Sequence, residues 1–182
     1  MRYVTLYLTI FFLLLIVAAL VIRGNFLEKH QAKLDIEPSK AITSPIKNAL
    51  VRGQMFKCTP TRLWDGDGPI WCAEGPKVRL AGIAAREMDE SCKANHPCPE
   101  ADGEEARNVL AGMLGRTIGR SSEGHLVIDG PTLTCVSAGS AGRGRTAAWC
   151  ISPSEGDLSC SMILAGMALR WDRYWDGHKC SH

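Results

Sequence analysis

The sequence lacks a strong excess of either charge. Its 182 residues hold 21 lysines and arginines against 19 aspartates and glutamates. Residues 1–54 carry seven basic and three acidic side chains, whereas residues 55–182 carry 14 basic and 16 acidic ones. Proteins that bind polyanions through bulk electrostatics usually have a basic domain. That class is excluded here, so any binding of an anionic polymer must rest on a local cluster of basic side chains.

The sequence also has no C-x-x-C pair and no internal repeat. Because zinc sites built from cysteines usually contain closely spaced thiols, a cysteine zinc site is disfavoured. All eight cysteines lie beyond residue 57, and an even number in a small domain is typical of disulfide-bonded proteins of oxidising compartments. Apolar residues make up 46% of the chain, which excludes wholesale disorder.

Residues 4–22 form an apolar run without a charged side chain. A helix over such a run spans roughly 28 Å at about 1.5 Å per residue, close to the hydrocarbon thickness of a bilayer. The run ends Leu20-Val21-Ile22-Arg23, without the small residues of a cleavage site. We therefore predict an uncleaved membrane anchor over residues 1–23. A signal peptide, which would give a secreted protein if cleaved, and a buried core helix are the alternatives.

Two patterns disagree about the side of the membrane on which the rest of the chain lies. These patterns are the basic residues after the apolar run and the number of cysteines. Arg23, Lys29 and Lys33 follow the apolar run, so the positive-inside rule favours the cytoplasm. The cysteines favour the opposite side, because disulfides persist outside the cytoplasm. We give the cysteines more weight and expect a single-pass cell-membrane protein with an extracytoplasmic (periplasmic or extracellular) domain over residues 55–182. Residues 24–54 are polar, contain two prolines and are predicted to be a linker.

Residues 55–182 show short strand patterns and two helical ones. Residues 55–63 and 69–72 flank an acidic glycine turn and are predicted to form a hairpin. Further strands are predicted over residues 77–83, 125–128, 133–136 and 145–151. Apolar spacing predicts helices over residues 101–115 and 158–169, the second with Asp157 as its N-cap. Short strands with two helices predict an α+β domain, with a small closed barrel as the expected sheet.

These expected elements also suggest how the cysteines pair. Eight cysteines allow 105 pairings, and we favour the set that joins hairpin arms, neighbouring strands, the ends of one proline-containing loop, and the last helix to the tail. The predicted pairs are Cys58–Cys72, Cys92–Cys98, Cys135–Cys150 and Cys160–Cys180.

Three polar clusters fall at the ends of predicted strands. The turn Asp65-Gly66-Asp67-Gly68 offers carboxylate oxygens of the kind that bind a hard cation such as Ca²⁺. An ordinary acidic turn is the alternative. Arg79 lies in an apolar strand, where a guanidinium group needs a partner or a ligand, and Glu87 follows that strand. The alternative for Arg79 is a simple ion pair with a carboxylate.

The third cluster is Gly142-Arg143-Gly144-Arg145-Thr146-Ala147-Ala148-Trp149. Glycines let the backbone approach an anion closely, and planar guanidinium groups can hold it. A basic surface turn is the alternative reading of this segment.

In their order and spacing these clusters resemble the staphylococcal nuclease (thermonuclease) family over residues ~55–176. The matching segments are WDGDGPI, KVRLAGIAARE, GRTAAW and DLSCSMILAGMALRWDRYW. The resemblance implies a five-stranded OB-fold β-barrel with two or three helices. It also implies an endonuclease, a phosphodiesterase that hydrolyses DNA and RNA, usually with Ca²⁺ and otherwise with another divalent metal.

Carried over by position, the resemblance implies that Arg79, Glu87 and Arg145 are catalytic and that Asp67 is a metal ligand, with Asp65 as a further candidate. The chemistry agrees with these roles. Hydrolysis of a phosphodiester places negative charge on phosphate oxygens, which positioned guanidinium groups and a divalent cation stabilise. Glu87 would orient or deprotonate the attacking water.

The sequence departs from the family pattern near the metal site. Ala84 stands where the family has a second metal-binding aspartate, so the site should bind Ca²⁺ more weakly unless Asp65, Asp89 or Glu90 compensates. Arg86 adds a positive charge, which would repel a cation or help to hold phosphate.

A second departure concerns the nucleotide. The tyrosine that flanks the nucleotide in the family, just before the position of Arg145, is absent. Trp171 and Tyr174 remain as candidate stacking surfaces for bases, with core packing as the alternative for Trp171.

Three functions are compatible with these patterns. The first is a membrane-tethered extracytoplasmic nuclease. The second is a catalytically weak or inactive OB-fold domain that binds nucleic acid or phosphate, which the Ala84 substitution and the acidic domain would favour. The third is a disulfide-stapled anchored domain with a structural or protein-binding role. No pattern in the sequence indicates the oligomeric state.

Overall fold

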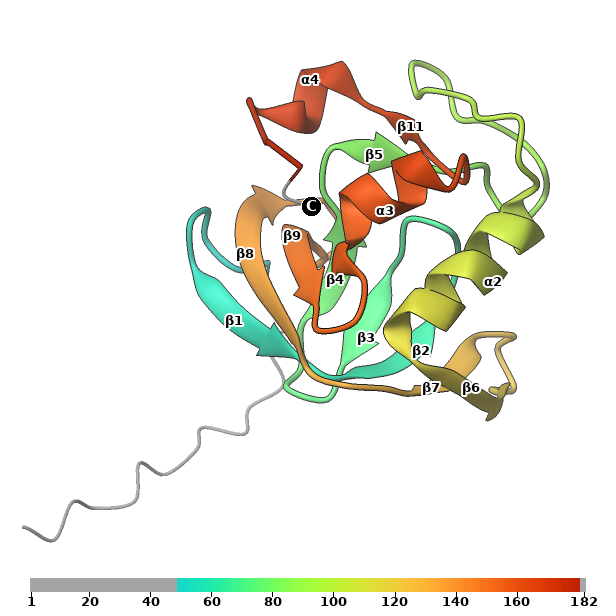
Figure 1. Cartoon of the computed structure of the whole chain (residues 1–182), viewed down its shortest axis with the longest axis vertical. Helices are drawn as coiled ribbons and strands as arrows, with labels where there is room; N and C mark the ends of the chain where they lie inside the picture. The colour runs from blue at the N-terminus through green and yellow to red at the C-terminus, as the bar shows by residue number, and fades with distance from the viewer. Residues whose placement is uncertain (1–48, 181–182) are drawn as a thin grey trace, which may run out of the picture. The chain divides into compact units, whose positions relative to one another are not determined.

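The computed structural model describes residues 49–180 (Figure 1), all of which fall in one compact unit, Thr43–His182. None of the helices in this described part is long and apolar enough to span a bilayer. The predicted anchor over residues 1–23 and nearly all of the predicted linker over residues 24–54 lie outside the described residues.

The described part is a mixed α+β structure, in which a large sheet forms the core and three short helices cover it. The helices are α2 (Gly103–Leu114), α3 (Leu158–Leu164) and α4 (Asp172–Trp175). The strands of the large sheet are β1 (Met55–Cys58), β2 (Pro60–Leu63), β3 (Ile70–Cys72), β4 (Lys77–Leu80), β6 (Arg116–Arg120), β7 (Leu126–Asp129), β8 (Leu133–Ser140), β9 (Thr146–Ser152) and β10 (Gly156–Asp157). β5 (Ile83–Ala84) and β11 (Leu169–Arg170) form a separate two-stranded sheet.

The strands of the large sheet pair in the order β1-β8-β9-β4-β3-β2-β7-β6, with β10 added to β9. All of these neighbours are antiparallel except β4 and β9, which run parallel. In this parallel pair Val78 lies opposite Thr146, and Arg79 lies opposite Ala147. The pairing therefore brings the start of β9 beside the strand that carries Arg79.

The predicted closed barrel is not present in residues 49–180, because the order of hydrogen-bonded strands is open, with β1 and β6 at its ends. The single strand expected over residues 55–63 is split at Thr59, and Pro60 has no N–H to donate to a ladder. As a result β1 pairs with β8, whereas β2 pairs with β3 and β7.

The core lies between the inner face of the sheet and helices α2 and α3. Leu63, Ile70, Val78 and Leu80 are fully buried on the strands that carry the candidate site. Helix α2 packs on β2, β6 and β7, and α3 packs on β9 and α2. Each fully buried side chain of this size contributes about 1.5–3 kcal/mol through its removal from water, so these four residues hold strands β2, β3 and β4 in place.

All four predicted disulfides are present, and no cysteine of the chain is free. The Cα atoms of the four pairs lie 4.1–5.7 Å apart. Cys58–Cys72 joins β1 to β3, and Cys135–Cys150 joins directly opposed residues of β8 and β9. The predicted N-cap is also confirmed, since the Asp157 carboxylate accepts a hydrogen bond from the Cys160 N–H at 3.0 Å.

The second predicted helix is shorter than expected. It ends at Leu164, and Gly166 follows with a φ of +75°, a left-handed conformation that glycine adopts readily. The chain then forms β11, which pairs with β5. This pairing places Leu169 and Arg170 beside Ala84 and Ile83, three to four residues before Glu87.

Candidate functional site

The turn between β2 and β3 holds two buried aspartates. The Asp67 N–H donates to the Asp65 carboxylate at 3.2 Å, and the Asp67 carboxylate accepts from the Ala85 N–H at 3.2 Å. A Cβ atom at Gly66 would lie 2.8 Å from the Ala85 Cβ atom and 2.5 Å from the Ala106 Cβ atom of α2. Glycine is therefore required at Gly66 for the turn to pack beneath α2, and this packing fixes both carboxylates.

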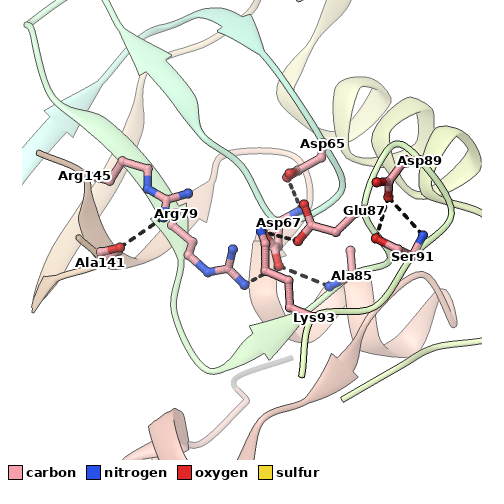
Figure 2. A network of polar contacts seen from close by, with 10 residues as sticks. All are labelled: Asp65, Asp67, Arg79, Ala85, Glu87, Asp89, Ser91, Lys93, Ala141 and Arg145. Carbon is pink, nitrogen blue, oxygen red and sulfur yellow. Dashed lines mark hydrogen bonds and ion pairs between the residues drawn. The ribbon is translucent and has the colours of Figure 1, made fainter. Parts of the chain in front are cut away.

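Arg79 projects from β4 toward this turn. Its neighbours Val78 and Leu80 are buried in the core, and side chains alternate along a strand, so Arg79 points to the opposite face. Its Nη2 atom lies 2.5 Å from the Asp67 Oδ2 atom, and only 12% of the side chain is exposed (Figure 2). The sequence predicts a carboxylate partner or a ligand for Arg79, and among the described residues the partner is Asp67.

Arg145 comes from the turn just before β9, the strand parallel to β4. Its Nε atom donates to the Gly142 carbonyl at 3.3 Å, and its Nη2 atom donates to the Ala141 carbonyl at 3.1 Å. No carboxylate of residues 49–180 pairs with it. Arg145 thus offers its guanidinium group beside Arg79 without an anionic partner in the described part of the chain (Figure 2).

Glu87 follows β5 and pairs with Lys93. The Lys93 Nζ atom lies 2.6 Å from the Glu87 Oε1 atom, and the Lys93 side chain is 54% exposed against 20% for Glu87. Figure 2 shows this pair beside Asp67. Lys93 is held in a loop that the Cys92–Cys98 disulfide closes. Sequence reasoning missed Lys93, although its place directly after a cysteine of a short predicted loop was an available signal.

The two aspartates form the most strongly perturbed pair in this site. Burial raises the pKa of Asp65 well above its ordinary value, and the charge of Asp67 adds to this rise, whereas Arg79 opposes it. Burial also raises the pKa of Asp67, with Arg79 again acting in the opposite direction. Two adjacent buried carboxylates with one arginine partner leave negative charge uncompensated. A hard divalent cation fits that donor set, with Asp65 and Asp67 as the residues that would hold it.

The carboxylates that were expected to compensate for Ala84 differ in whether they lie beside Asp67. Ala84 is fully buried and offers no side-chain oxygen. The Asp89 carboxylate accepts from the N–H and hydroxyl of Ser91, and the Glu90 carboxylate accepts from the Gly103 N–H at 3.0 Å. Asp89 is therefore engaged within its own loop, and Glu90 is engaged at the first residue of α2. Asp65 is the one expected compensating carboxylate that lies beside Asp67.

Arg86 holds the same loop rather than the turn of the two aspartates. Its Nη1 atom donates to the Glu90 carbonyl at 3.0 Å, and its Nη2 atom donates to the Pro99 carbonyl at 2.8 Å. The sequence suggested that Arg86 would repel a cation or hold phosphate. Its contacts instead assign it to the folding of the segment between β5 and α2.

Trp171 and Tyr174, the predicted stacking residues, lie together beside that loop. Their ring centroids are 4.6 Å apart, and the Trp171 ring lies 4.1 Å from that of His96. Burial lowers the pKa of His96, and the positive charges of Arg79 and Lys93 lower it further. Tyr174 is 49% exposed and Trp171 is half-buried, whereas Trp175 is the buried tryptophan of this segment. His96 therefore lies between the aromatic pair and the charged side chains of Arg79 and Lys93.

Within residues 49–180, the group of three side chains with the spacing of a metal site lies away from Asp65 and Asp67. Asp157, Cys160 and His178 bring ligand-type atoms within 4.8 Å of one another. The Cys160 sulfur is bonded to Cys180, however, so it offers no thiolate. His178 lies 2.6 Å from the Asp157 carboxylate and stacks on Trp149 with ring centroids 3.7 Å apart. These contacts fasten the C-terminal tail to α3 and β9.

Replacing Asp65 by asparagine should stabilise the metal-free protein at neutral and alkaline pH. Burial raises the folded-state pKa of Asp65 above its unfolded value. The contribution of Asp65 to the unfolding free energy is therefore fully present below the unfolded pKa and is lost as the pH rises through the folded pKa. Asparagine stays neutral at every pH. The gain in unfolding free energy, measured by urea denaturation in EDTA, should grow from pH 4 to pH 8 and reach about 1–3 kcal/mol.

The exposed Asp89→Asn variant is the matched control, and it should not gain stability as the pH rises. A Ca²⁺ ion held by Asp65 and Asp67 would raise the melting temperature of the wild type and leave that of Asp65→Asn nearly unchanged, because a ligand stabilises only the state that binds it. Equal stabilisation of the two proteins by Ca²⁺ would show that Asp65 does not hold the ion. A loss of stability in Asp65→Asn at pH 8 would contradict the claim that the ionised Asp65 carboxylate destabilises the metal-free protein.

Comparison of the chain with known proteins finds no matching family model, no matching curated protein and no matching solved structure.

Proposed function

We propose that this protein is a phosphodiesterase of the thermonuclease type, an endonuclease that hydrolyses DNA or RNA with the help of a divalent metal. The observation that supports this most strongly is the meeting of Arg79 and Glu87 at the turn of Asp65 and Asp67, with Arg145 beside Arg79. The turn after β2 supplies two buried aspartates, β4 supplies Arg79, the turn before β9 supplies Arg145, and the segment after β5 supplies Glu87 (Figure 2).

These groups can divide the work of phosphodiester hydrolysis among them. Arg145 and Arg79 are positioned to stabilise the negative charge that develops on the phosphate oxygens. A divalent cation, when bound by the aspartates, supplies further neutralisation of that charge. Glu87 orients the attacking water and accepts its proton once Lys93, the more exposed partner of the pair, moves away. The new bond is between the water oxygen and phosphorus. The bond to the 5′ oxygen breaks, and this oxygen takes up a proton from solvent water, so the products are a 3′-phosphate and a 5′-hydroxyl.

We also propose that the strands follow an OB-fold topology without closing into a barrel. β1 and β2 follow one another along the chain with Thr59 alone between them. β1 pairs with β8 at one end of the paired order, and β2 pairs with β3. The direct succession of β1 and β2 along the chain supports this topology, in which the order of hydrogen-bonded strands stays open.

We also propose that the domain lies outside the cytoplasm, tethered to the membrane by residues 1–23. Its four disulfides support this location, because such bonds persist in oxidising compartments. Alkaline phosphatase fused after Leu50 should be active in cells, since the enzyme needs its own disulfides. An inactive fusion at normal expression would contradict the proposed side of the membrane.

A second candidate function is binding of nucleic acid or phosphate without turnover. Two observations favour it. Arg79 and Glu87 are both engaged in ion pairs, with Asp67 and Lys93 respectively, and Ala84 contributes no metal ligand. Such a domain would hold a phosphate but would lack a free base and a strong metal site.

The two functions are separated by incubating the full-length protein, in a non-ionic detergent, with labelled single-stranded DNA at millimolar Ca²⁺. The nuclease proposal predicts cleavage that stops in EDTA and yields 3′-phosphate ends. Binding that inorganic phosphate competes away, without cleavage, selects the second function. Absence of both cleavage and binding would reject both.

A further inference from the structure

A group of aromatic and cationic side chains lies on the outer face of β2, β3 and β4, apart from the candidate site. Leu63, Ile70 and Val78 on these strands are buried in the core. Because side chains alternate along a strand, the residues next to them point outward. The group, here called the basic–aromatic strip, consists of Arg62, Trp64, Trp71, Lys77 and His125.

The strip is continuous across the strands. Arg62 lies opposite Trp71 in the β2–β3 pair, and Trp71 lies opposite Lys77 in the β3–β4 pair. The Arg62 guanidinium carbon is 5.3 Å from the Trp71 ring centroid, and the Lys77 Nζ atom is 5.8 Å from it. His125 adds a third ring, with its centroid 4.4 Å from that of Trp71 and 5.2 Å from that of Trp64.

The cations of the strip lack acidic partners among the residues that the structure describes. Neither Arg62 nor Lys77 forms an ion pair with a residue of the described range 49–180. Burial lowers the pKa of His125, and the positive charge of Arg62 lowers it further, so this ring is neutral at physiological pH. The strip therefore combines two free positive charges with three neutral aromatic rings, in a domain whose residues 55–182 are acidic overall.

The strip leads directly to the candidate site. Lys77 and Arg79 are two residues apart on β4 and so point to the same face. Arg145 immediately precedes Thr146, which lies opposite Val78 on the parallel strand β9. Positive side chains consequently follow one another from Arg145 through Arg79 and Lys77 to Arg62. The Trp71 ring lies between Lys77 and Arg62.

We propose that the basic–aromatic strip binds the single-stranded nucleic acid that flanks the scissile phosphate, with bases on the aromatic rings and phosphates on Arg62 and Lys77. Aromatic rings beside a line of cations are the usual means of holding single strands, because unstacked bases have free faces that a duplex hides. The alignment of the strand with the cleavage site rests on the proposed function, whereas binding to the strip does not require cleavage.

An anionic lipid surface is negatively charged, as a nucleic acid strand is, but it fits the strip less well. The rings of Trp64, Trp71 and His125 are half-buried among their neighbours. Aromatic side chains that anchor a protein to a bilayer must reach into the interface between water and lipid. Rings that lie within the face of a sheet instead suit a flat base.

The test uses the full-length protein in a non-ionic detergent, in a Glu87→Gln background so that the probe is not cut. Binding of fluorescent oligo(dT) is followed by anisotropy over a range of salt concentrations. Trp71→Ala should weaken binding about 5- to 100-fold, and Trp71→Phe should restore most of it. Arg62→Ala and Lys77→Ala should each reduce the slope of log affinity against log salt by about 0.7. Lys57→Ala, an exposed lysine on β1, is the charge-matched control and should change the affinity little.

Acetylation of lysines provides a second readout, in which oligo(dT) should protect Lys77 and leave Lys57 reactive. Unchanged affinity in Trp71→Ala and Lys77→Ala would overturn the strip, even if the wild type cleaves DNA. Protection of Lys77 by phosphatidylglycerol micelles and not by oligo(dT) would assign the strip to lipid and would also overturn it. Loss of binding in the strip variants of a protein that does not cleave would support the strip while rejecting the proposed nuclease.

Discussion

Replacing Arg145 by alanine should lower the rate of phosphodiester hydrolysis about 10²- to 10³-fold. Arg145 is the arginine of the site that has no carboxylate partner in residues 49–180, and its hydrogen bonds go to the carbonyls of Ala141 and Gly142. Its positive charge is therefore free to act on a phosphate, and one positioned donor of this kind typically contributes about 3–4 kcal/mol to transition-state stabilisation. The measurement is kcat/KM on single-stranded DNA at saturating Ca²⁺.

Two further variants separate the effect of the guanidinium group from that of charge alone. Arg145→Lys keeps the charge but loses the planar pair of donors, so it should recover only part of the rate. Arg143→Ala removes an exposed arginine from the same turn and should leave the rate nearly unchanged. If Arg143→Ala and Arg145→Ala lose activity equally, the turn acts through general electrostatics and the specific role of Arg145 is wrong.

Removing the Cys135–Cys150 disulfide should cost about 3 kcal/mol of unfolding free energy. Both cysteines are fully buried, and they lie directly opposite each other on β8 and β9. The disulfide closes a loop with a sequence separation of 15. A cross-link over a loop of about 15 residues lowers the conformational entropy of the unfolded chain by the equivalent of about 3 kcal/mol. The double variant Cys135→Ala/Cys150→Ala should therefore show a lower urea midpoint than the wild type.

The Cys92→Ala/Cys98→Ala variant is the matched control for this prediction. Its disulfide closes a shorter loop, with a sequence separation of 6, and Cys98 is exposed, so its removal should cost less stability. Equal urea midpoints for the wild type and the β8–β9 variant would show that this bond does not support the fold. Eight reactive thiols in the native protein would contradict the disulfides altogether.

Features that depend on local sequence were predicted correctly. The helix over residues 101–115 matches α2, and the Asp157 cap precedes α3 as expected. The disulfides could be predicted because strand and loop assignments place the paired cysteines close together. β6 was missed because all five of its residues are exposed, so that no alternation of apolar and polar residues marks it as a strand.

Features that depend on long-range geometry were beyond the sequence. The spacing of Arg79 and Glu87 suggested that they act near one another, but it could not indicate that Arg79 would pair with Asp67 and Glu87 with Lys93. The choice of partner depends on how the turn after β2 packs beneath α2 and on where the Cys92–Cys98 loop places its lysine. The same limit applies to the sheet, because the split at Thr59 depends on which strands lie beside β1 and β2.

The proposed nuclease site requires Glu87 and Arg145 to act on one phosphate, and a double-mutant cycle measures this coupling. Glu87→Gln, Arg145→Ala and the combined variant are compared with the wild type in kcat/KM on single-stranded DNA. Residues that act as a unit have strongly non-additive effects. We expect a loss of about 10²- to 10³-fold in each single variant and little further loss in the combined one. Single variants that cleave as fast as the wild type, or two losses that simply multiply, would contradict it.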